Sequence, residues 1–198
     1  MSLAIYGGSF NPPHNGHISA VETVLRELAP DHFLIIPDCL APHKVMPAGT
    51  PSPGERLELC RLAFGGFGNV TVSDMELQRG GTSYTSDTIA AIRADFDGEI
   101  FLVIGSDMLL SFSTWHEFEY ILKNCTLAVL SREENDLEEL RSAAESLEEL
   151  YGASVTILPH SPVVVSSTQV RKALRRGRAG SLVPASVIDY IESHNLYI

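Results

Sequence analysis

Short apolar runs alternate along the chain with stretches in which apolar residues recur at helical spacing. The runs predict buried strands, and they lie at 3–6, 33–36, 70–72, 99–104, 126–130, 154–158 and 163–165. The helical stretches are 18–28, 54–64, a segment with Ile89 and Ile92, 132–151, and a segment that begins at Ser166. Strands that alternate with helices favour a mainly parallel sheet with helices on both faces. The pattern therefore predicts an α/β fold that is Rossmann-like and doubly wound.

No internal repeat, low-complexity tract or linker divides the chain. Its 198 residues suffice for one ordinary α/β domain with a core, and hydrophobic residues make up 44% of them. We therefore expect a single domain over residues 1–198, with a C-terminal helical part from about residue 167. The stretch 132–151 carries many acidic residues opposite an apolar stripe that includes Tyr151, which predicts a helix with one solvated face.

Charge and cysteine content narrow the classes of protein further. The formal net charge is −11, so the surface should repel nucleic acid and anionic membranes. The three cysteines, Cys39, Cys60 and Cys125, are far apart and odd in number, which favours a reducing cytoplasm. No signal-peptide pattern precedes the first strand, and no apolar run approaches the ~20 residues that span a bilayer. We expect a cytoplasmic protein that binds neither nucleic acid nor membrane.

The segment after the first strand carries the strongest chemical pattern. It contains Gly7-Gly8, Pro12-Pro13 and His14-Asn15-Gly16-His17, and it leads into a helix. Glycines without a Cβ let the backbone approach a ligand closely, and the N-terminal end of the helix suits an anion such as phosphate. Two histidines three residues apart can also be a helix cap and a packing residue, or a zinc pair, although no further His/Cys cluster has ligand spacing. The segment is not a P-loop, because that motif is absent.

Four further residues are candidate site residues, and each also has an ordinary structural interpretation. Lys44 lies on a long proline-containing loop but could be a plain solvated lysine. Asp107 follows a strand, where open α/β sheets bind ligands, or it caps a helix. Trp115 could stack on a flat ring or belong to the core. Arg171 begins a basic segment that ends at Arg178. Arg171 and Arg175 share a helix face, and the segment is predicted to bind an anion near the N-terminal end of this helix. The alternative is that the basic residues complement the negative C-terminal end of the helix dipole.

The opening segment Gly-Gly-Ser-Phe-Asn-Pro-Pro-His-Asn-Gly-His resembles the signature of the nucleotidylyltransferase superfamily, and most closely the bacterial nicotinate-nucleotide adenylyltransferases. The similarity continues in the same order through Thr82-Ser83-Tyr84-Thr85, Thr114-Trp115-His116 and Ser166-Ser167-Thr168 to the end of the chain. At Ala41 the chain departs from the family, which has a second proline before the segment Pro-His-Lys.

The resemblance implies a set of site residues. The implied catalytic residues are His14, His17, Lys44 and Arg171. The implied ATP-binding residues are Gly7, Gly8, Ser9, Phe10, His14, His17, Gly105, Asp107, Ser167, Thr168 and Arg171. The implied residues for nicotinate mononucleotide are Asn11, Lys44, Thr82, Ser83, Tyr84, Thr85, Trp115 and His116. The hydroxyls of 82–85 are also expected to cap the helix that follows them.

The resemblance implies adenylyl transfer from ATP to nicotinate mononucleotide, with release of pyrophosphate, as a step of NAD biosynthesis. Mg²⁺ would arrive with ATP, and we expect no dedicated protein metal site. The alternatives are a sister nucleotidylyltransferase with another phosphate acceptor and a non-catalytic nucleotide sensor; a class I aminoacyl-tRNA synthetase is disfavoured, because the chain is short and acidic. The sequence leaves open the preference for the acid or the amide substrate and the oligomeric state, for which a homo-oligomer is one option.

Overall fold

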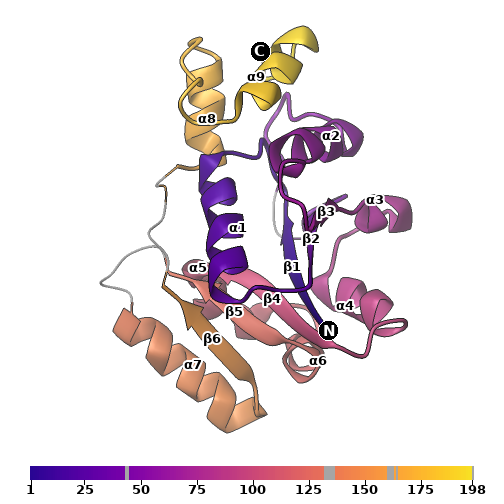
Figure 1. Cartoon of the computed structure of the whole chain (residues 1–198), viewed down its shortest axis with the longest axis vertical. Helices are drawn as coiled ribbons and strands as arrows, with labels where there is room; N and C mark the ends of the chain where they lie inside the picture. Colours follow the sequence, from indigo (N-terminus) through magenta and orange to yellow (C-terminus); the bar gives the residue numbers. More distant parts are fainter. Residues whose placement is uncertain (43–44, 132–136, 160–162, 164, 198) are drawn as a thin grey trace. The chain divides into compact units, whose positions relative to one another are not determined.

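The computed structural model describes residues 1–42, 45–131, 137–159, 163 and 165–197, and it forms a six-stranded sheet from them (Figure 1). The strands follow one another in the sheet in the order β3-β2-β1-β4-β5-β6, the strand order of a Rossmann fold. Register is given for the pairs β1–β4, β4–β5 and β5–β6, and each of these pairs is parallel. The strands are β1 (Ser2–Gly8), β2 (His32–Pro37), β3 (Val70–Val72), β4 (Glu99–Gly105), β5 (Thr126–Leu130) and β6 (Ser154–Leu158).

Helices connect successive strands and complete the doubly wound α/β fold predicted from the sequence. None of the helices in the described ranges is long and apolar enough to cross a membrane. The α-helices are α1 (Asn15–Glu27), α2 (Pro53–Phe64), α3 (Met75–Arg79), α4 (Thr85–Arg93), α5 (Ser106–Leu110), α6 (Phe118–Asn124), α7 (Leu137–Tyr151), α8 (Ser167–Leu174) and α9 (Ala185–Ser193), and one 3-10 helix, η1, spans Phe112–Thr114.

The chain divides into two compact units, and several elements run from one into the other. The first unit comprises Met1–Tyr6, Ala20–Leu34 and Tyr84–Pro162. The second unit comprises Gly7–Ser19, Ile35–Ser83 and Val163–Ile198.

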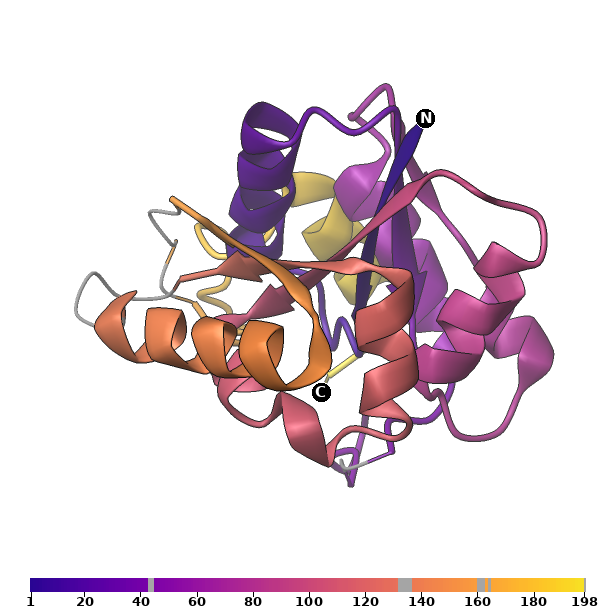
Figure 2. The same ribbon diagram turned by 90° about the horizontal axis from the view of Figure 1, so that it is seen from below.

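The first unit is built on the strands β4, β5 and β6. Most apolar residues of β4 and β5 are almost fully buried, whereas in β6 only Leu158 is. Ile104 and Val129 are paired across β4 and β5. Helix α5 packs on β4 and β5, and α7 packs on β6. Figure 2 shows α7 on one face of these strands and the Ala20–Glu27 part of α1 on the opposite face. The face of α7 that carries Leu140 and Leu147 is buried, as its helical spacing predicts.

The second unit has its core where α2 packs against α9. Helix α2 begins with a capping box, in which the side chains of Ser52 and Glu55 bond each other's backbone N–H, so the start of this helix is well defined. Ser166 and Gln169 form the same motif at the start of α8. The core cluster consists of Leu59, Val170, Val183, Val187, Ile191 and Tyr197.

Four local predictions are wrong. Val163 and Val165 lie in no strand. Tyr151 is exposed, although its ring lies edge-to-face with that of Phe118, with the ring centroids 5.1 Å apart. Helix α4 has Tyr84 at its N-cap without a side-chain cap bond; the hydroxyl of Ser83 instead accepts a hydrogen bond from the N–H of Cys39, at 2.9 Å.

The fourth wrong prediction concerns Arg171. Helix α8 is only eight residues long, so Arg171 lies in its last turn and Arg175 is the C-cap residue. A turn at Gly177, whose φ is +62°, follows shortly after the helix ends. The predicted helix over 132–151 begins at Leu137 in the structure, and residues 132–136 lie outside the described ranges.

Candidate active site

The predicted signature residues lie at the end of β1, in the loop that follows it and in the first turn of α1, all in the second unit. Phe10, Asn11 and His14 are buried. Phe10 has φ +42°, a left-handed conformation that is uncommon and strained for a residue other than glycine. A Cβ on Gly16 would lie 3.0 Å from the carbonyl oxygen of Val163 and 3.1 Å from the ring of His14. A side chain at this position would therefore require the backbone at Val163 or the ring of His14 to shift by a few tenths of an ångström.

The two histidines of the signature form a stacked pair. Their ring centroids are 3.7 Å apart and their planes differ by 23°. The backbone N–H of His14 donates to Nδ1 of His17, at 3.1 Å, so the neutral His17 ring carries its proton on Nε2. The carbonyl of His14 accepts from the N–H of His17 at 2.8 Å, which places His14 at the N-cap of α1. The arrangement therefore contains the helix cap that was considered from the sequence.

Burial decides the charge of His14. Burial lowers the pKa of His14 to about 4, because a charged imidazolium loses its hydration there. The ring is therefore neutral near pH 7. Within the described residues, Nδ1 of His14 and Oδ1 of Asn11 have no hydrogen-bond partner. His14 can thus contribute hydrogen bonding and shape near neutral pH, but it supplies no positive charge.

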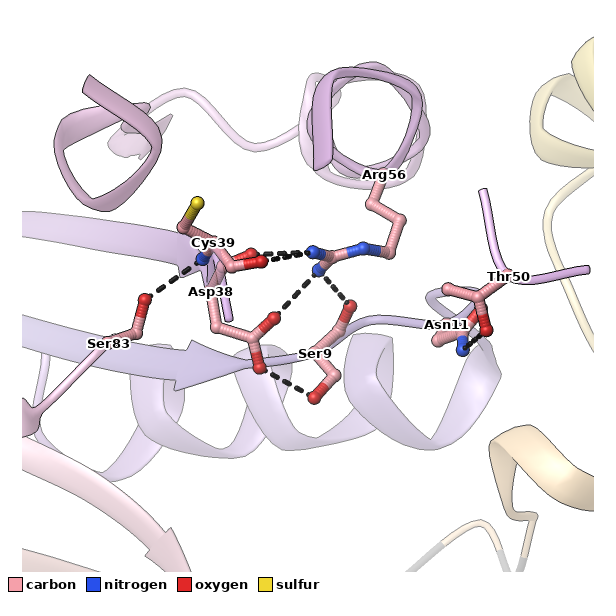
Figure 3. A network of polar contacts seen from close by, with 7 residues as sticks. All are labelled: Ser9, Asn11, Asp38, Cys39, Thr50, Arg56 and Ser83. Carbon is pink, nitrogen blue, oxygen red and sulfur yellow. Dashed lines mark hydrogen bonds and ion pairs between the residues drawn. The ribbon is translucent and has the colours of Figure 1, made fainter. Parts of the chain in front are cut away.

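A buried arginine holds the loop after β1 to the end of β2 (Figure 3). Arg56 on α2 is 1% exposed. Its Nη1 donates to the carbonyl of Ser9 at 2.7 Å and to Oδ1 of Asp38 at 2.9 Å. Its Nη2 donates to the carbonyls of Asp38, at 2.7 Å, and Cys39, at 3.3 Å. The Ser9 hydroxyl completes the network by donating to Oδ2 of Asp38 at 2.6 Å.

The network continues from Cys39 to the segment before α4. Ser83 accepts from the N–H of Cys39, and its own N–H donates to the carbonyl of Leu40 at 2.9 Å. Leu40 and Thr82 form an isolated parallel bridge. Thr82 and Ser83, both predicted to bind the mononucleotide, are thereby positioned by the loop that follows β2.

Arg171 is tied to the same signature loop from the start of the C-terminal region. Its Nη1 donates to the carbonyl of Asn11 at 2.7 Å, and its Nη2 donates to Oγ1 of Thr168 at 3.1 Å. The hydroxyl of Ser167 donates to the carbonyl of Pro12 at 3.2 Å. The amide of Asn11 donates in turn to Oγ1 of Thr50, at 3.0 Å. Segments that are about 160 residues apart in sequence therefore meet at this loop.

The first unit contains a group of aromatic side chains. The rings of Tyr84 and His116 are stacked with centroids 4.2 Å apart. Trp115 is half-buried, and its ring lies 5.0 Å from that of Phe112 with an interplanar angle of 29°. Trp115 is thus neither fully in the core nor fully exposed, and Phe112, which is buried, supports it. Thr85 is the first residue of α4, next to this group.

Gly105 and Asp107 stand at the end of β4, as predicted. Gly105 is the last residue of the strand and the N-cap of α5, while Asp107 is exposed in the first turn of that helix. Asp107 is therefore not the N-cap residue, the alternative considered from the sequence. A carboxylate in the first turn is electrostatically favoured by the helix dipole.

The predicted residues thus form two sets. Within the first unit lie Tyr84, Thr85, Gly105, Asp107, Trp115 and His116. Within the second unit lie Gly7, Gly8, Ser9, Phe10, Asn11, His14, His17, Thr82, Ser83, Ser167, Thr168 and Arg171. Lys44, predicted for both catalysis and mononucleotide binding, lies outside the described residues.

Sequence reasoning missed Arg56 and Asp38. A signal was present, because Arg56 precedes Cys60 and Phe64 at intervals of four on the buried face of α2. A charged residue in an apolar helical stripe needs a buried partner. Asp38, directly after a strand, was an available partner, but only the fold shows that the two meet.

Comparisons with known proteins agree with this architecture. A profile of the family described as cytidylyltransferase-like matches residues 5–173. A probable nicotinate-nucleotide adenylyltransferase from Pseudomonas aeruginosa is 35% identical over an alignment that covers 98% of this chain and 96% of the relative. The corresponding protein from Pseudomonas entomophila is 36% identical, with 98% and 94% covered.

Solved structures share the fold at lower sequence identity. The nicotinic acid mononucleotide adenylyltransferase of Plasmodium falciparum, complexed with NaAD, superposes with a TM-score of 0.78 at 17% identity, covering 99% of this chain and 97% of that one. A putative nicotinate-nucleotide adenylyltransferase from Vibrio parahaemolyticus gives 0.69 at 22% identity, with 96% and 98% covered. The chain belongs to the cytidylyltransferase-like family and, within it, to the nicotinate-nucleotide adenylyltransferases. This confirms the resemblance noted in the sequence.

Proposed function

We propose that the protein transfers the adenylyl group of ATP to nicotinate mononucleotide, giving nicotinate adenine dinucleotide and pyrophosphate in NAD biosynthesis. The observation that carries the proposal is the 35% identity to nicotinate-nucleotide adenylyltransferases over almost the whole chain. The local geometry of the signature loop supports it, because His14, His17 and Arg171 gather around one short segment.

The chemistry needs two anions to be positioned and charge to be stabilised. A phosphate oxygen of the mononucleotide attacks the α-phosphorus of ATP in line, the bond from that phosphorus to the bridging oxygen breaks, and pyrophosphate leaves. A phosphate anion needs no general base. The rate enhancement then comes from orientation and from hydrogen bonds that strengthen in the transition state.

We assign the signature loop to the phosphates of ATP. The Nε2–H of His17 suits a non-bridging oxygen of the transferring phosphorus, and neutral His14 supports the ring of His17 by stacking. Arg171, together with Ser167 and Thr168, would bind the departing β- and γ-phosphates. The guanidinium of Arg171 already lies on the loop through its bond to Asn11. Gly7 and Gly8, together with Ser9, Phe10, Gly105 and Asp107, complete the proposed ATP set.

We assign the aromatic group of the first unit to the pyridine of the mononucleotide. The stacked rings of Tyr84 and His116 and the supported ring of Trp115 offer flat apolar faces. Thr82, Ser83 and Thr85 supply hydroxyl and backbone donors, and Asn11 and Lys44 complete the proposed set. Lys44 would neutralise the phosphate of the mononucleotide.

Mg²⁺ is proposed to arrive on the phosphates of ATP. No three His, Cys, Asp or Glu side chains cluster within the described ranges in a way that would hold a metal. The carboxylates of this chain fit an ion that is carried by ATP, because Mg²⁺ commonly takes its ligands from substrate phosphates and one or two carboxylates. The exposed Asp107 is one such carboxylate. The ion would neutralise charge on the polyphosphate.

We further propose that the chain acts as one domain, in the cytoplasm. The family profile and the relatives cover nearly the whole chain, and all three cysteines are free thiols. The oligomeric state is best tested directly by light scattering, with a homo-oligomer as one outcome.

The decisive experiment compares two acceptors. Pyrophosphate release from ATP and Mg²⁺ is measured with nicotinate mononucleotide and, separately, with nicotinamide mononucleotide. We expect release that strongly favours the acid. Equal rates would keep the adenylyl transfer and remove the acid preference. Release with another phosphate acceptor would favour a sister transferase, and ATP binding without turnover would favour a sensor.

A further inference from the structure

A buried serine on α4 contacts the imidazole of the aromatic group. Oγ of Ser86 lies 3.2 Å from Nδ1 of His116, and Ser86 is 1% exposed. His116 is an exposed residue, and its ring stacks on that of Tyr84 at a centroid distance of 4.2 Å and an interplanar angle of 25°. The imidazole is thus held at two points, by the face of a ring and by one hydroxyl.

The position of Ser86 indicates the direction of this hydrogen bond. Ser86 is the second residue of α4, in the first turn, where the backbone offers unpaired N–H groups rather than carbonyls. Thr88, two residues further on, bonds the carbonyl of Tyr84 instead, at 3.3 Å. Nδ1 of His116 is therefore the natural acceptor for the hydroxyl proton of Ser86. In the neutral ring the imidazole proton then lies on Nε2.

We propose that Ser86 is a positioning residue that fixes His116 as an Nε2–H donor and thereby favours a pyridine carboxylate over a carboxamide. The inference rests on the proposed function, because it concerns the acceptor substrate of that reaction. A carboxylate only accepts hydrogen bonds, and a bond to an ionised acceptor is roughly twice as strong as a neutral one. A carboxamide can meet the same N–H only through its neutral oxygen.

Loss of the Ser86 hydroxyl would free the imidazole. The neutral ring could then carry its proton on Nδ1 and present a lone pair on Nε2. That lone pair would repel a carboxylate and could accept from a carboxamide. Ser86→Ala is therefore expected to lower kcat/KM for nicotinate mononucleotide by roughly tenfold, chiefly through KM, and to leave that for nicotinamide mononucleotide within about threefold.

A double-mutant cycle tests whether Ser86 acts through His116. The variants are Ser86→Ala, His116→Ala and the double variant, assayed at pH 8 with both substrates. The tenfold effect of Ser86→Ala should disappear in the His116→Ala background. Thr88→Val is the matched control, because it removes a similarly buried hydroxyl from α4 that donates to the backbone carbonyl of Tyr84. Its effect should be the same in both backgrounds. An undiminished effect of Ser86→Ala without His116 would overturn the proposal.

A second readout does not depend on turnover. The ¹⁵N shifts of the His116 imidazole report which nitrogen carries the proton. We expect the Nε2–H form in the wild-type protein and a mixture of both forms in Ser86→Ala. Identical tautomers in the two proteins would refute the role of Ser86. Absence of pyrophosphate release with both substrates would refute the proposed function. In that case the ¹⁵N comparison would still decide whether Ser86 sets the tautomer of His116.

Discussion

Replacing Arg56 tests the network that holds the signature loop. Arg56→Met keeps a long apolar stem but removes the guanidinium, and with it four hydrogen bonds to Ser9, Asp38 and Cys39. The carboxylate of Asp38, whose side chain is 10% exposed, would keep the Ser9 hydroxyl but lose its counter-charge. The variant therefore leaves a nearly buried charge uncompensated.

Arg56→Met should lower the free energy of unfolding substantially but leave the protein folded. Removing one partner of a buried ion pair typically costs about 3–5 kcal/mol, against a total stability on the order of 5–15 kcal/mol. For a domain of this size such a loss lowers Tm by about 10 °C. We would measure the free energy of unfolding by urea titration, followed by far-UV circular dichroism and by the fluorescence of Trp115.

Two further variants make the test specific. Arg61→Met on the same helix removes an exposed pair with Glu58 at 3.3 Å, and it should cost less than about 1 kcal/mol. Asp38→Asn combined with Arg56→Met should cost less than the sum of the single changes, since the uncompensated charge is gone. A loss below about 1 kcal/mol in Arg56→Met, or strict additivity in the double variant, would refute this account of the network.

Three other predictions concern the histidines and a helix cap. His17→Ala should lower turnover by at least ~100-fold with an unchanged circular dichroism spectrum, because it removes a transition-state donor; unaltered pyrophosphate release would exclude that role. Burial lowers the pKa of His14 to about 4 in the folded protein from 6.5, so the unfolded chain binds the extra proton between these values. Because of His14, the free energy of unfolding therefore falls by about 3 kcal/mol as the pH falls from 7 to 4. Urea titrations across this range should show a smaller fall in His14→Gln, and an equal fall would contradict the assignment. Ser166→Ala breaks the capping box of α8 and should cost about 1 kcal/mol, whereas Ser146→Ala on the exposed face of α7 should cost nearly nothing by the same titration.

Elements with a strong local signal were predictable from the sequence. The run 100–104 is apolar throughout, and it forms most of β4, which lies between parallel neighbours. The pair of histidines in the signature segment also needed little tertiary information, because they are three residues apart and contact each other at the start of α1.

Weak or conflicting local signals misled the prediction. Three valines at 163–165 favour a strand by propensity, yet Val163 and Val165 lie in none, because a strand exists only where a neighbour pairs with it. The hydroxyls before α4 suggested a cap, but Ser83 bonds Cys39, which lies 44 residues earlier in the chain. The residues around Ser83 in the sequence do not indicate a hydrogen-bond partner so far away in the chain.

The sequence by itself determined the class of fold, the signature loop and the family, since each rests on periodicity or on spacing within a short segment. Only the tertiary structure showed the pair of Arg56 and Asp38, the tie from Arg171 to Asn11, and the contact between Ser86 and His116. Each of these joins residues 18 to 160 positions apart. Such contacts depend on how the helices and loops pack around the sheet, so the side chains that fix the orientation of the candidate site became visible only in the folded chain.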